Sequence, residues 1–229
     1  MTDSLPTLLL TRPEPQSQAF LNKCEALAGH RLPAVISPIM RIEATGELPD
    51  LDRYETIIFT SGNGVRCFLE KAGLAGRKVV TVGEGTAELA RANGAEAEAL
   101  GEDIDAFLAM RHLVTAPALF CCGVHSRGNL ARELTDAGIQ TDEVVIYDQV
   151  SQPLTVAARQ LLTGTGPIVA PVFSPRSARL LCGHGLITAP LTIIAMSRNV
   201  AEAWQGPGRV LTAEAPNSRS MCCLTVSQF

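Results

Sequence analysis

The sequence predicts an α/β protein, and three recurring local features support this class. Short runs of β-branched and other apolar residues recur along the chain, and small polar residues follow each run. Each run then continues as a helical pattern that stops at a glycine. Capping chemistry favours this order of strand, N-cap, helix and C-terminal glycine. Such alternation gives parallel sheets with helices on both faces.

Six strand–turn–helix units follow one another along the chain. The expected strands are residues 8–11, 57–60, 79–82, 118–121, 169–173 and 193–195. The glycines expected to end the helices are Gly29, Gly73, Gly94, Gly138, Gly183 and Gly206. Each turn into a helix therefore lies at the carboxyl end of a strand, where open α/β sheets bind their ligands.

The units repeat at about half the chain length. The matched segments are residues 11–38 with 121–147, 61–66 with 174–179, and 83–88 with 197–202. The chain is interpreted as A–B–A′–B′, a duplication that would produce two similar domains facing a shared cleft. Chance similarity between generic α/β units is the alternative.

These patterns are compatible with two divisions of the chain into domains. Pro38 and Pro153 lie near the A-to-B and A′-to-B′ crossings, where linkers are expected. Residues from about 40 to 147 can form one domain while the two ends form the other. The chain can equally form two sequential halves.

Composition and charge exclude several classes of protein. The chain has 229 residues, of which 46% are hydrophobic and 18% are charged, against roughly 25% charged in an average protein. This core-rich composition excludes a disordered tail, a collagen-like chain and a coiled coil. The net charge of −4 argues against a general nucleic-acid binder, which needs a basic surface.

We expect a soluble protein of the cytoplasm that binds no membrane. The N-terminus carries an acidic residue where a signal peptide has basic ones, and its apolar run, Leu8–Leu10, is short. No stretch approaches the roughly 18 apolar residues of a membrane span. The seven cysteines include no CxxC pair, so we expect buried thiols in a reducing compartment rather than disulfides or a zinc site.

Several common catalytic motifs are absent from the sequence. It contains no GxxxxGK[ST], HExxH or GxSxG pattern. Residues 83–88 follow a strand but lack the third glycine of a dinucleotide fingerprint. A nucleotide-dependent enzyme is therefore disfavoured.

The remaining candidate sites are helix N-termini rich in Ser, Thr, Gly and Asn. Such termini present unpaired backbone N–H groups and a partial positive charge, and they bind anions. Up to six of them in one cleft would hold a ligand with many carboxylates without a basic surface. For any single loop, simple helix capping is the alternative.

Individual side chains at these turns have a functional and a structural interpretation. Arg12 and Arg176 lie in the first turn of a helix, where the dipole disfavours a cation unless an anion binds nearby, and Arg127 is similar. A surface salt bridge is the alternative. Tyr147, one of two tyrosines, ends a short strand and is expected to donate a hydrogen bond or proton in the cleft. Packing on a domain edge is its alternative.

Seven short motifs occur in a fixed order between about residue 6 and residue 205. They are Leu9-Leu10-Thr11-Arg12-Pro13, Phe59-Thr60-Ser61-x-Asn63-x-Val65, Val82-Gly83-x-x-Thr86-Ala87, Ser126-Arg127-Gly128-x-Leu130, the strand ending at Tyr147, Phe173-Ser174-Pro175-x-Ser177 and Ser197-x-x-Val200-Ala201. This ordered set resembles the uroporphyrinogen-III synthase family. Gly62 and Gly64 are expected to make the loop at Ser61 flexible.

The resemblance implies a division into domains. It implies two flavodoxin-like domains with parallel sheets, one of them discontinuous, joined by a two-stranded connector. The discontinuous domain would comprise residues 1–36 and 152–229, and the central domain residues 40–147. The crossings would lie near residues 37–39 and 148–151.

The resemblance also implies a substrate and a reaction. The substrate would be hydroxymethylbilane, a linear tetrapyrrole with eight carboxylates. A cyclising lyase would close it to uroporphyrinogen III with inversion of ring D and release of water, in tetrapyrrole (haem, sirohaem, cobalamin or chlorophyll) biosynthesis. No metal or organic cofactor is implied. A non-catalytic two-domain binder of an anionic small molecule is the alternative function.

Site residues and partners follow from the same resemblance. Tyr147 is the expected catalytic residue, assisting the departure of the hydroxyl group. The expected substrate-binding residues are Thr11, Arg12, Thr60, Ser61, Asn63, Gly83, Thr86, Gly123, Arg127, Ser174, Pro175, Arg176, Ser177 and Ser197. A monomer is expected, and the one partner considered is the upstream bilane-producing enzyme, in a transient contact.

Overall fold

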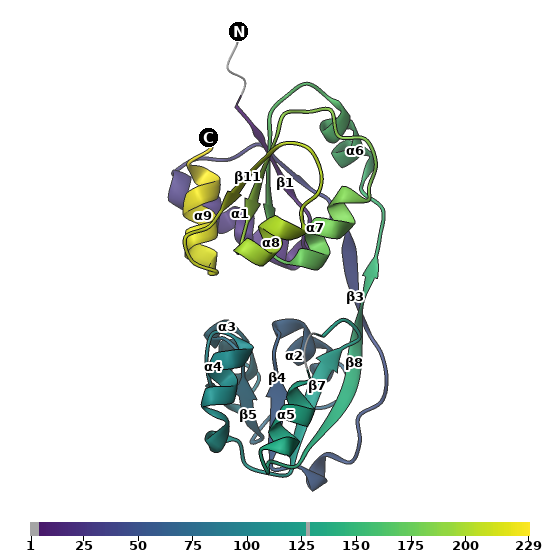
Figure 1. Ribbon diagram of the computed structural model, residues 1–229, viewed down its shortest axis with the longest axis vertical. Helices are drawn as coiled ribbons and strands as arrows, with labels where there is room; N and C mark the ends of the chain where they lie inside the picture. Colours follow the sequence, from purple (N-terminus) through teal and green to yellow (C-terminus); the bar gives the residue numbers. More distant parts are fainter. Residues whose placement is uncertain (1–4, 127–128) are drawn as a thin grey trace. The chain divides into compact units, whose positions relative to one another are not determined.

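The computed structural model describes residues 5–126 and 129–229 of the chain. The chain forms two compact units, each built from strands that alternate with helices (Figure 1). Unit 1 comprises Met1–Arg41 together with Ser151–Phe229, and unit 2 comprises Ile42–Val150. The α/β class predicted from the sequence is confirmed.

Unit 1 holds a five-stranded parallel sheet with the strand order β11-β10-β9-β1-β2. Its strands are β1 (Thr7–Leu10), β2 (Ala34–Ile36), β9 (Ile168–Val172), β10 (Leu191–Ala195) and β11 (Arg209–Thr212). Its helices are α1 (Glu14–Ala28), α6 (Val156–Thr163), α7 (Pro175–Cys182), α8 (Arg198–Ala203) and α9 (Ser218–Val226). Counted along unit 1 alone, the strand order is 2-1-3-4-5, the flavodoxin-like arrangement.

Unit 2 holds a six-stranded sheet with the order β3-β8-β7-β4-β5-β6. Its strands are β3 (Met40–Ala44), β4 (Thr56–Phe59), β5 (Lys78–Thr81), β6 (Glu96–Ala99), β7 (Ala118–Gly123) and β8 (Thr141–Ser151). Its helices are α2 (Gly62–Leu69), α3 (Glu84–Arg91), α4 (Ile104–Ala109) and α5 (Leu130–Asp136), with 3₁₀ turns at Leu51–Arg53 and Arg111–Leu113. The five strands from β8 to β6 pair in parallel.

The two sheets share one spatial arrangement with different chain connections. The order β2-β1-β9-β10-β11 in unit 1 corresponds to β8-β7-β4-β5-β6 in unit 2. The corresponding strands come from the segments that the A–B–A′–B′ interpretation pairs. Each unit therefore combines strands from the first and the second half of the chain, which is one of the two divisions that the repeat leaves open.

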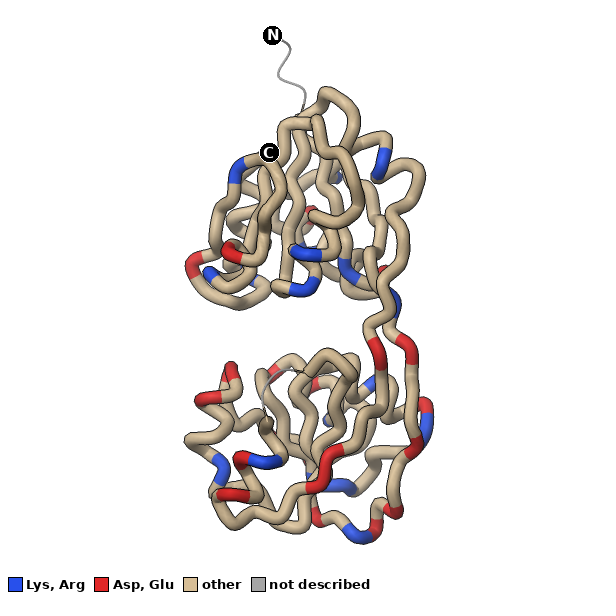
Figure 2. The backbone as a smooth tube through the Cα atoms, turned by 45° about the vertical axis from the view of Figure 1, so that its right-hand side comes forward, with Lys and Arg blue, Asp and Glu red and all other residues tan. Residues whose placement is uncertain are grey.

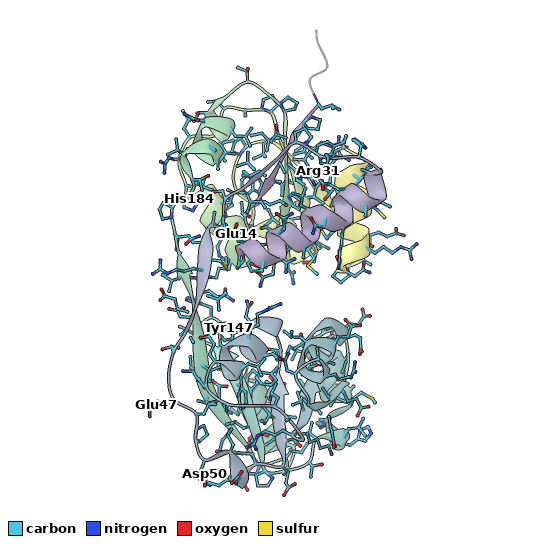
Figure 3. The ribbon with its side chains drawn as sticks, turned by 180° about the vertical axis from the view of Figure 1, so that it is seen from behind. Glu14, Arg31, Glu47, Asp50, Tyr147 and His184 are labelled. Atoms are coloured by element: carbon cyan, nitrogen blue, oxygen red, sulfur yellow. The ribbon has the colours of Figure 1, made fainter. Side chains whose placement is uncertain are left out.

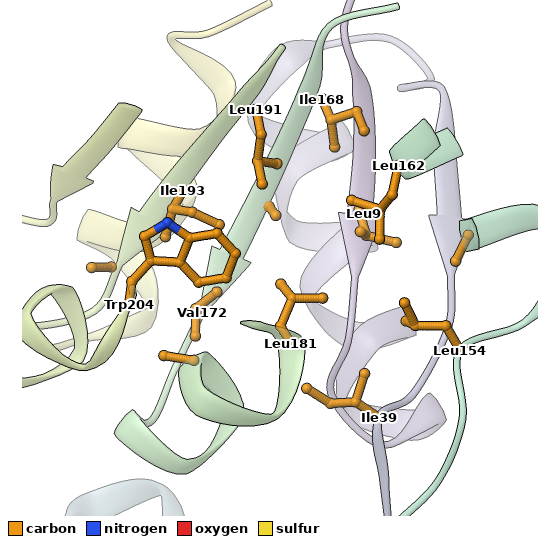
Figure 4. Packing of buried hydrophobic residues seen from close by; sticks show 14 of the residues in the cluster. Leu9, Ile39, Leu154, Leu162, Ile168, Val172, Leu181, Leu191, Ile193 and Trp204 are labelled. Atoms are coloured by element: carbon orange, nitrogen blue, oxygen red, sulfur yellow. The ribbon is translucent and has the colours of Figure 1, made fainter. Parts of the chain in front are cut away.

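Apolar side chains cover both faces of the sheet in unit 1. Leu9 faces a cluster that includes Leu181 and Trp204 (Figure 4). Leu8 and Leu10 face a second cluster on the other side, formed with α1 and α9. This alternation follows because successive side chains of a strand point to opposite faces.

Unit 2 is packed in the same way. Phe59 and Phe68 meet edge to face with ring centroids 5.5 Å apart on one side of the sheet. On the other side, Phe107 of α4 is fully buried with Leu130 and Leu134 of α5. Each unit therefore has its own pair of apolar layers.

Strand β8 differs from its predicted extent. The apolar run over residues 144–146 predicts a strand that ends at Tyr147, but β8 continues to Ser151. The continuation pairs with β3 through backbone groups: Thr45 N donates to Ile146 O and Gln152 N donates to Ile39 O. Such pairing needs no apolar side chain, so the hydrophobic pattern does not reveal it.

The cysteines are free thiols, and most of them are buried as expected. The buried thiols are those of Cys24, Cys67, Cys121, Cys122 and Cys222. Cys182 is half-buried, and the expectation of burial is wrong for Cys223, which is exposed. Among the described residues, no helix is both long and apolar enough to cross a membrane.

Truncation of Phe107 should destabilise unit 2. We expect Phe107→Ala to lower the free energy of unfolding by about 3–5 kcal/mol, because the side chain is fully buried and its removal leaves a cavity. Urea unfolding followed by circular dichroism measures this change. Met110→Ala, at the exposed end of the same helix, is the control and should stay within about 0.5 kcal/mol of the wild type.

Candidate functional site

In unit 1, the predicted residues lie in loops at one edge of the sheet. Thr11 and Arg12 follow β1, residues 174–177 follow β9, and Ser197 follows β10. These three strands are neighbours and run parallel, so their carboxyl ends lie at the same edge. The structure brings this group of residues together.

The loop after β9 is a capped helix start. The Ser174 hydroxyl accepts a hydrogen bond from Ser177 N at 3.1 Å and lies 2.8 Å from the Ser177 hydroxyl. Pro175 occupies the first turn, where its missing N–H costs nothing. Capping thus accounts for Ser174, while Ser197 at the start of α8 makes no side-chain cap.

An aromatic ring positions Arg12. Its guanidinium carbon lies 4.2 Å from the centroid of the Phe173 ring, and that ring packs edge to face on Phe20. Arg12 O also accepts a hydrogen bond from the Ser17 hydroxyl at 2.8 Å. The cation–π contact holds the charge between the loops after β1 and β9, a contact that the sequence pattern did not indicate.

In unit 2, a second group lies at the corresponding edge. Thr60, Ser61 and Asn63 follow β4, Gly83 and Thr86 follow β5, and Gly123 ends β7 beside Tyr147 on β8. These four strands are neighbours and parallel, so this group also shares one edge. Arg127, the remaining predicted residue, lies outside the described residues.

Part of this second group is occupied by internal hydrogen bonds. The Ser61 hydroxyl accepts from Asn63 N at 3.1 Å and caps α2. Gly83 adopts a positive φ of 79°, and its N–H donates to Gly101 O at 2.7 Å. The Gly83 amide is therefore engaged within the unit, and Thr86 N is engaged as well, since it donates to Gly83 O at 3.1 Å.

The Tyr147 ring lies between two glycines. A Cβ on Gly123 would stand 2.5 Å from Tyr147 Cε2, and a Cβ on Gly64 would stand 3.7 Å from Cε1. The residue is only 6% exposed, and the Ser61 side chain lies near enough to its phenol to influence the phenol's pKa. The absence of a side chain at Gly123 gives the ring its place, whereas a Cβ on Gly64 would make only an ordinary contact with Tyr147 and would crowd Phe59 at 3.1 Å.

Burial raises the pKa of Tyr147, and the Ser61 side chain opposes part of this rise. The phenol, which is protonated at neutral pH in any tyrosine, therefore stays protonated to a higher pH here. A buried, protonated hydroxyl at the carboxyl edge of a parallel sheet is suited to donate a proton or a hydrogen bond to a ligand.

Sequence analysis missed some neighbours of Tyr147. Gly62 and Gly64 lie inside α2 rather than in a loop, and a buried glycine inside a helix, such as Gly64, indicates a close contact. Val124 N donates to Tyr147 O at 3.0 Å, and His125 Nε2 lies 3.3 Å from Asp148 Oδ1. These contacts tie the segment after β7 to β8.

A cavity in unit 2 lies away from the predicted site. It encloses about 680 Å³ at the amino ends of β7 and β8, and Figure 3 labels Glu47 of its lining well apart from Tyr147. Its acidic lining residues are Glu47, Asp136, Asp142 and Glu143. Such a lining repels carboxylates, so we place no anionic ligand there.

The formal charge is distributed unevenly between the units. Unit 1 contains ten Lys and Arg residues against five Asp and Glu, whereas unit 2 contains nine against eighteen. Figure 2 shows this difference along the backbone. The net charge of the whole chain is therefore the sum of a basic unit 1 and an acidic unit 2.

Among the described residues, no cluster of three or more His, Cys, Asp or Glu side chains is placed to bind a metal ion.

Addition of a single methyl group at Gly123 should disturb Tyr147. We expect Gly123→Ala to lower the free energy of unfolding by about 1–3 kcal/mol, because the new Cβ overlaps the ring. Gly85→Ala in α3 is the matched control, since nothing lies within 4 Å of its added Cβ. Equal urea midpoints for the two variants would contradict the proposed ring packing.

The buried phenol should also make stability depend on alkaline pH. A folded pKa above the unfolded value of about 10 means that the stabilisation is complete below pH ~10 and is lost as the pH rises through the folded pKa. The melting temperature of the wild type should therefore fall more steeply in that range than that of Tyr147→Phe. Tyr54 is present in both proteins and cancels; parallel curves would refute the assignment.

Comparisons with known proteins agree on one family. A family model described as uroporphyrinogen-III synthase HemD matches residues 24–223. The uroporphyrinogen-III synthase of Chlorobaculum parvum is 28% identical over 164 residues, and the match spans 65% of this chain and 65% of that relative.

Solved structures share the fold. The uroporphyrinogen-III synthetase of Helicobacter pylori gives a TM-score of 0.70 at 16% identity, covering 98% of this chain and 100% of that one. A mutant uroporphyrinogen III synthase of Thermus thermophilus gives 0.52 at 13% identity, covering 97% and 98%. Because the family model spans most of the sequence, the chain belongs to the uroporphyrinogen-III synthase HemD family.

Proposed function

We propose that this protein is a uroporphyrinogen-III synthase. It would cyclise hydroxymethylbilane with inversion of ring D and release water. The observation that carries the proposal is the buried Tyr147 phenol, which packs against Gly123 and lies near Ser61 at the carboxyl edge of its sheet, in a chain of this family.

Substrate binding would rest on the two groups of loops. In unit 1, the binding residues are Thr11, Arg12, Ser174, Pro175, Arg176, Ser177 and Ser197; in unit 2, they are Thr60, Ser61, Asn63, Gly83, Thr86, Gly123 and Arg127. The basic charge of unit 1 favours a ligand with eight carboxylates. Arginine and helix N-terminal amides are the donors that suit carboxylates.

The proposed reaction begins when the terminal hydroxyl of the bilane leaves as water. Tyr147 donates a hydrogen bond or proton to that hydroxyl, and an azafulvene cation forms on the substrate. The substituted carbon of ring D attacks this cation and gives a spiro intermediate, which fragments and closes again with ring D inverted.

Positioning would supply most of the catalysis. The unassisted bilane closes without inversion, so the protein must hold both ends of the substrate in the geometry that leads to the inverted ring. Tyr147 is the one proton donor assigned to the reaction. We further propose that the protein acts as a monomer in the cytoplasm, where it supplies tetrapyrrole biosynthesis. A transient contact with the bilane-producing enzyme would shorten the exposure of the unstable substrate.

The isomer of the product tests the activity. The protein is mixed with hydroxymethylbilane generated enzymatically, the product is oxidised, and isomers I and III are separated by chromatography. Isomer III is expected. Isomer I alone refutes the synthase, and tight binding of the bilane without turnover would instead support a non-catalytic carrier.

The same assay tests the role of Tyr147. We expect Tyr147→Phe to fold normally and to form isomer III about 10²–10⁴-fold more slowly, the usual contribution of one positioned acid. Tyr54→Phe is the control, because Tyr54 lies away from the candidate site. Its hydroxyl donates a hydrogen bond to Asp142 Oδ2 at 2.7 Å. A full rate for Tyr147→Phe would show that the phenol only fills space.

A further inference from the structure

Two buried thiols meet where the first and last helices of the chain pack together. Helices α1 and α9 lie side by side on one face of the unit 1 sheet (Figures 1 and 3). Cys24 of α1 is fully buried and Cys222 of α9 is 5% exposed, and both belong to the same apolar cluster. Each thiol is also the main cause of the shifted pKa of the other.

The surroundings of the two thiols favour a thiolate at Cys222. The neighbouring Cys24 thiol lowers the pKa of Cys222 from its usual value near 9 to about 7, with further help from the Ser218 side chain and the charge of Lys23. Burial opposes this shift. In contrast, burial raises the pKa of Cys67, Cys121 and Cys122. A low pKa beside a cation is the usual mark of a reactive cysteine.

The pair lies close to the surface of the seam between the helices. Lys23 and Ser218 are exposed, and Lys23 Nζ lies 3.4 Å from the Ser218 hydroxyl. Ser218 in turn helps to lower the pKa of Cys222. A small oxidant that reaches the exposed Ser218 side chain has therefore reached a neighbour of the Cys222 thiol. Cys223, the next residue, is exposed.

We propose that Cys24 and Cys222 form an oxidisable pair, in which a peroxide oxidises Cys222 and Cys24 then closes a disulfide between α1 and α9. The Cys222 thiolate attacks one oxygen of hydrogen peroxide, the O–O bond breaks, and hydroxide leaves and becomes water. The Cys24 thiol then attacks the sulfenic sulfur, the S–O bond breaks, and a second water leaves. Two thiols and one peroxide thus become one disulfide and two waters.

The disulfide would link the two ends of the chain. Cys24 belongs to the first segment of unit 1 and Cys222 to the second, and unit 2 lies between them in sequence. Closing so long a loop restricts the unfolded chain strongly. We expect the oxidised protein to melt about 5–10 °C higher than the reduced protein. A dithiol reductant should reverse the shift.

Peptide mapping of the full chain tests the pair directly. The reduced protein is treated with hydrogen peroxide, its remaining thiols are alkylated, and it is digested with trypsin without reduction. Cleavage after Lys23, Arg31 and Arg219 releases peptides 24–31 and 220–229. We expect these two peptides to appear joined, with the loss of two hydrogens.

The adjacent cysteine provides the matched control. Peptide 220–229 contains both Cys222 and Cys223, and exposure alone favours reaction at Cys223. The linked peptides should persist in Cys223→Ser and disappear in Cys222→Ser. In Cys24→Ser, dimedone should trap a sulfenic acid on Cys222. Fragmentation of the linked wild-type peptide between the two cysteines gives the same assignment if a variant fails to fold.

Three results would overturn the proposal. One is a link that is lost in Cys223→Ser, and another is a bond between Cys222 and Cys223 within one peptide. The third is the absence of linked peptides at a peroxide dose that has oxidised Cys223. These outcomes are independent of the isomer assay, so the thiol pair and the proposed synthase activity can each fail alone.

Discussion

Backbone hydrogen bonds between parallel strands determine where the candidate residues lie. Strand β9 pairs with β1 on one side and β10 on the other, all in the same direction. The loops that follow them must therefore emerge at one edge, whatever their own sequences. Strands β8, β7, β4 and β5 impose the same condition in unit 2. The polar loop residues come together because the apolar strand residues beneath them are paired.

Within that frame, one glycine makes room for an aromatic ring. Gly123 has no side chain at the end of β7, where a Cβ would stand 2.5 Å from the Tyr147 ring. Gly64 is buried inside α2, where glycine weakens a helix by about 1 kcal/mol relative to alanine, and the side chain that its Cβ would crowd is Phe59, at 3.1 Å. The fit at Gly123 thus places a phenol in an apolar environment, which raises its pKa.

The fold class follows directly from residue patterns. Helix caps such as Ser61 and Ser174, and the glycine after α1, are local features whose chemistry depends on a few neighbouring residues. Most expected strands agree with the structure to within a residue or two, because their side chains are buried on both faces of the sheets. The continuation of β8 to Ser151 depends on pairing with a distant strand, and no local pattern encodes that.

At the candidate site, contacts between residues far apart in the sequence could likewise not be predicted from local patterns. The stacking of Arg12 on Phe173 joins two ends of the chain, and the fit of Gly123 to Tyr147 becomes visible only once β7 and β8 are aligned. The engagement of the Gly83 amide by Gly101 is of the same kind. Residue types and order indicated which loops matter, whereas the role of each group depends on its three-dimensional neighbours.

The interrupted layout of unit 1 has a consequence for biosynthesis on the ribosome. Strands β1 and β2 emerge first, but β9, β10 and β11 are translated only after all of unit 2. Until then, β1 lacks its neighbour β9, and one edge of the nascent pair stays open. Unit 2 is contiguous and can be completed while the final third of the polypeptide is still being translated. Unit 2 can therefore finish folding before unit 1, although the N-terminal segment of unit 1 leaves the ribosome first. That segment must wait for the C-terminal segment of unit 1.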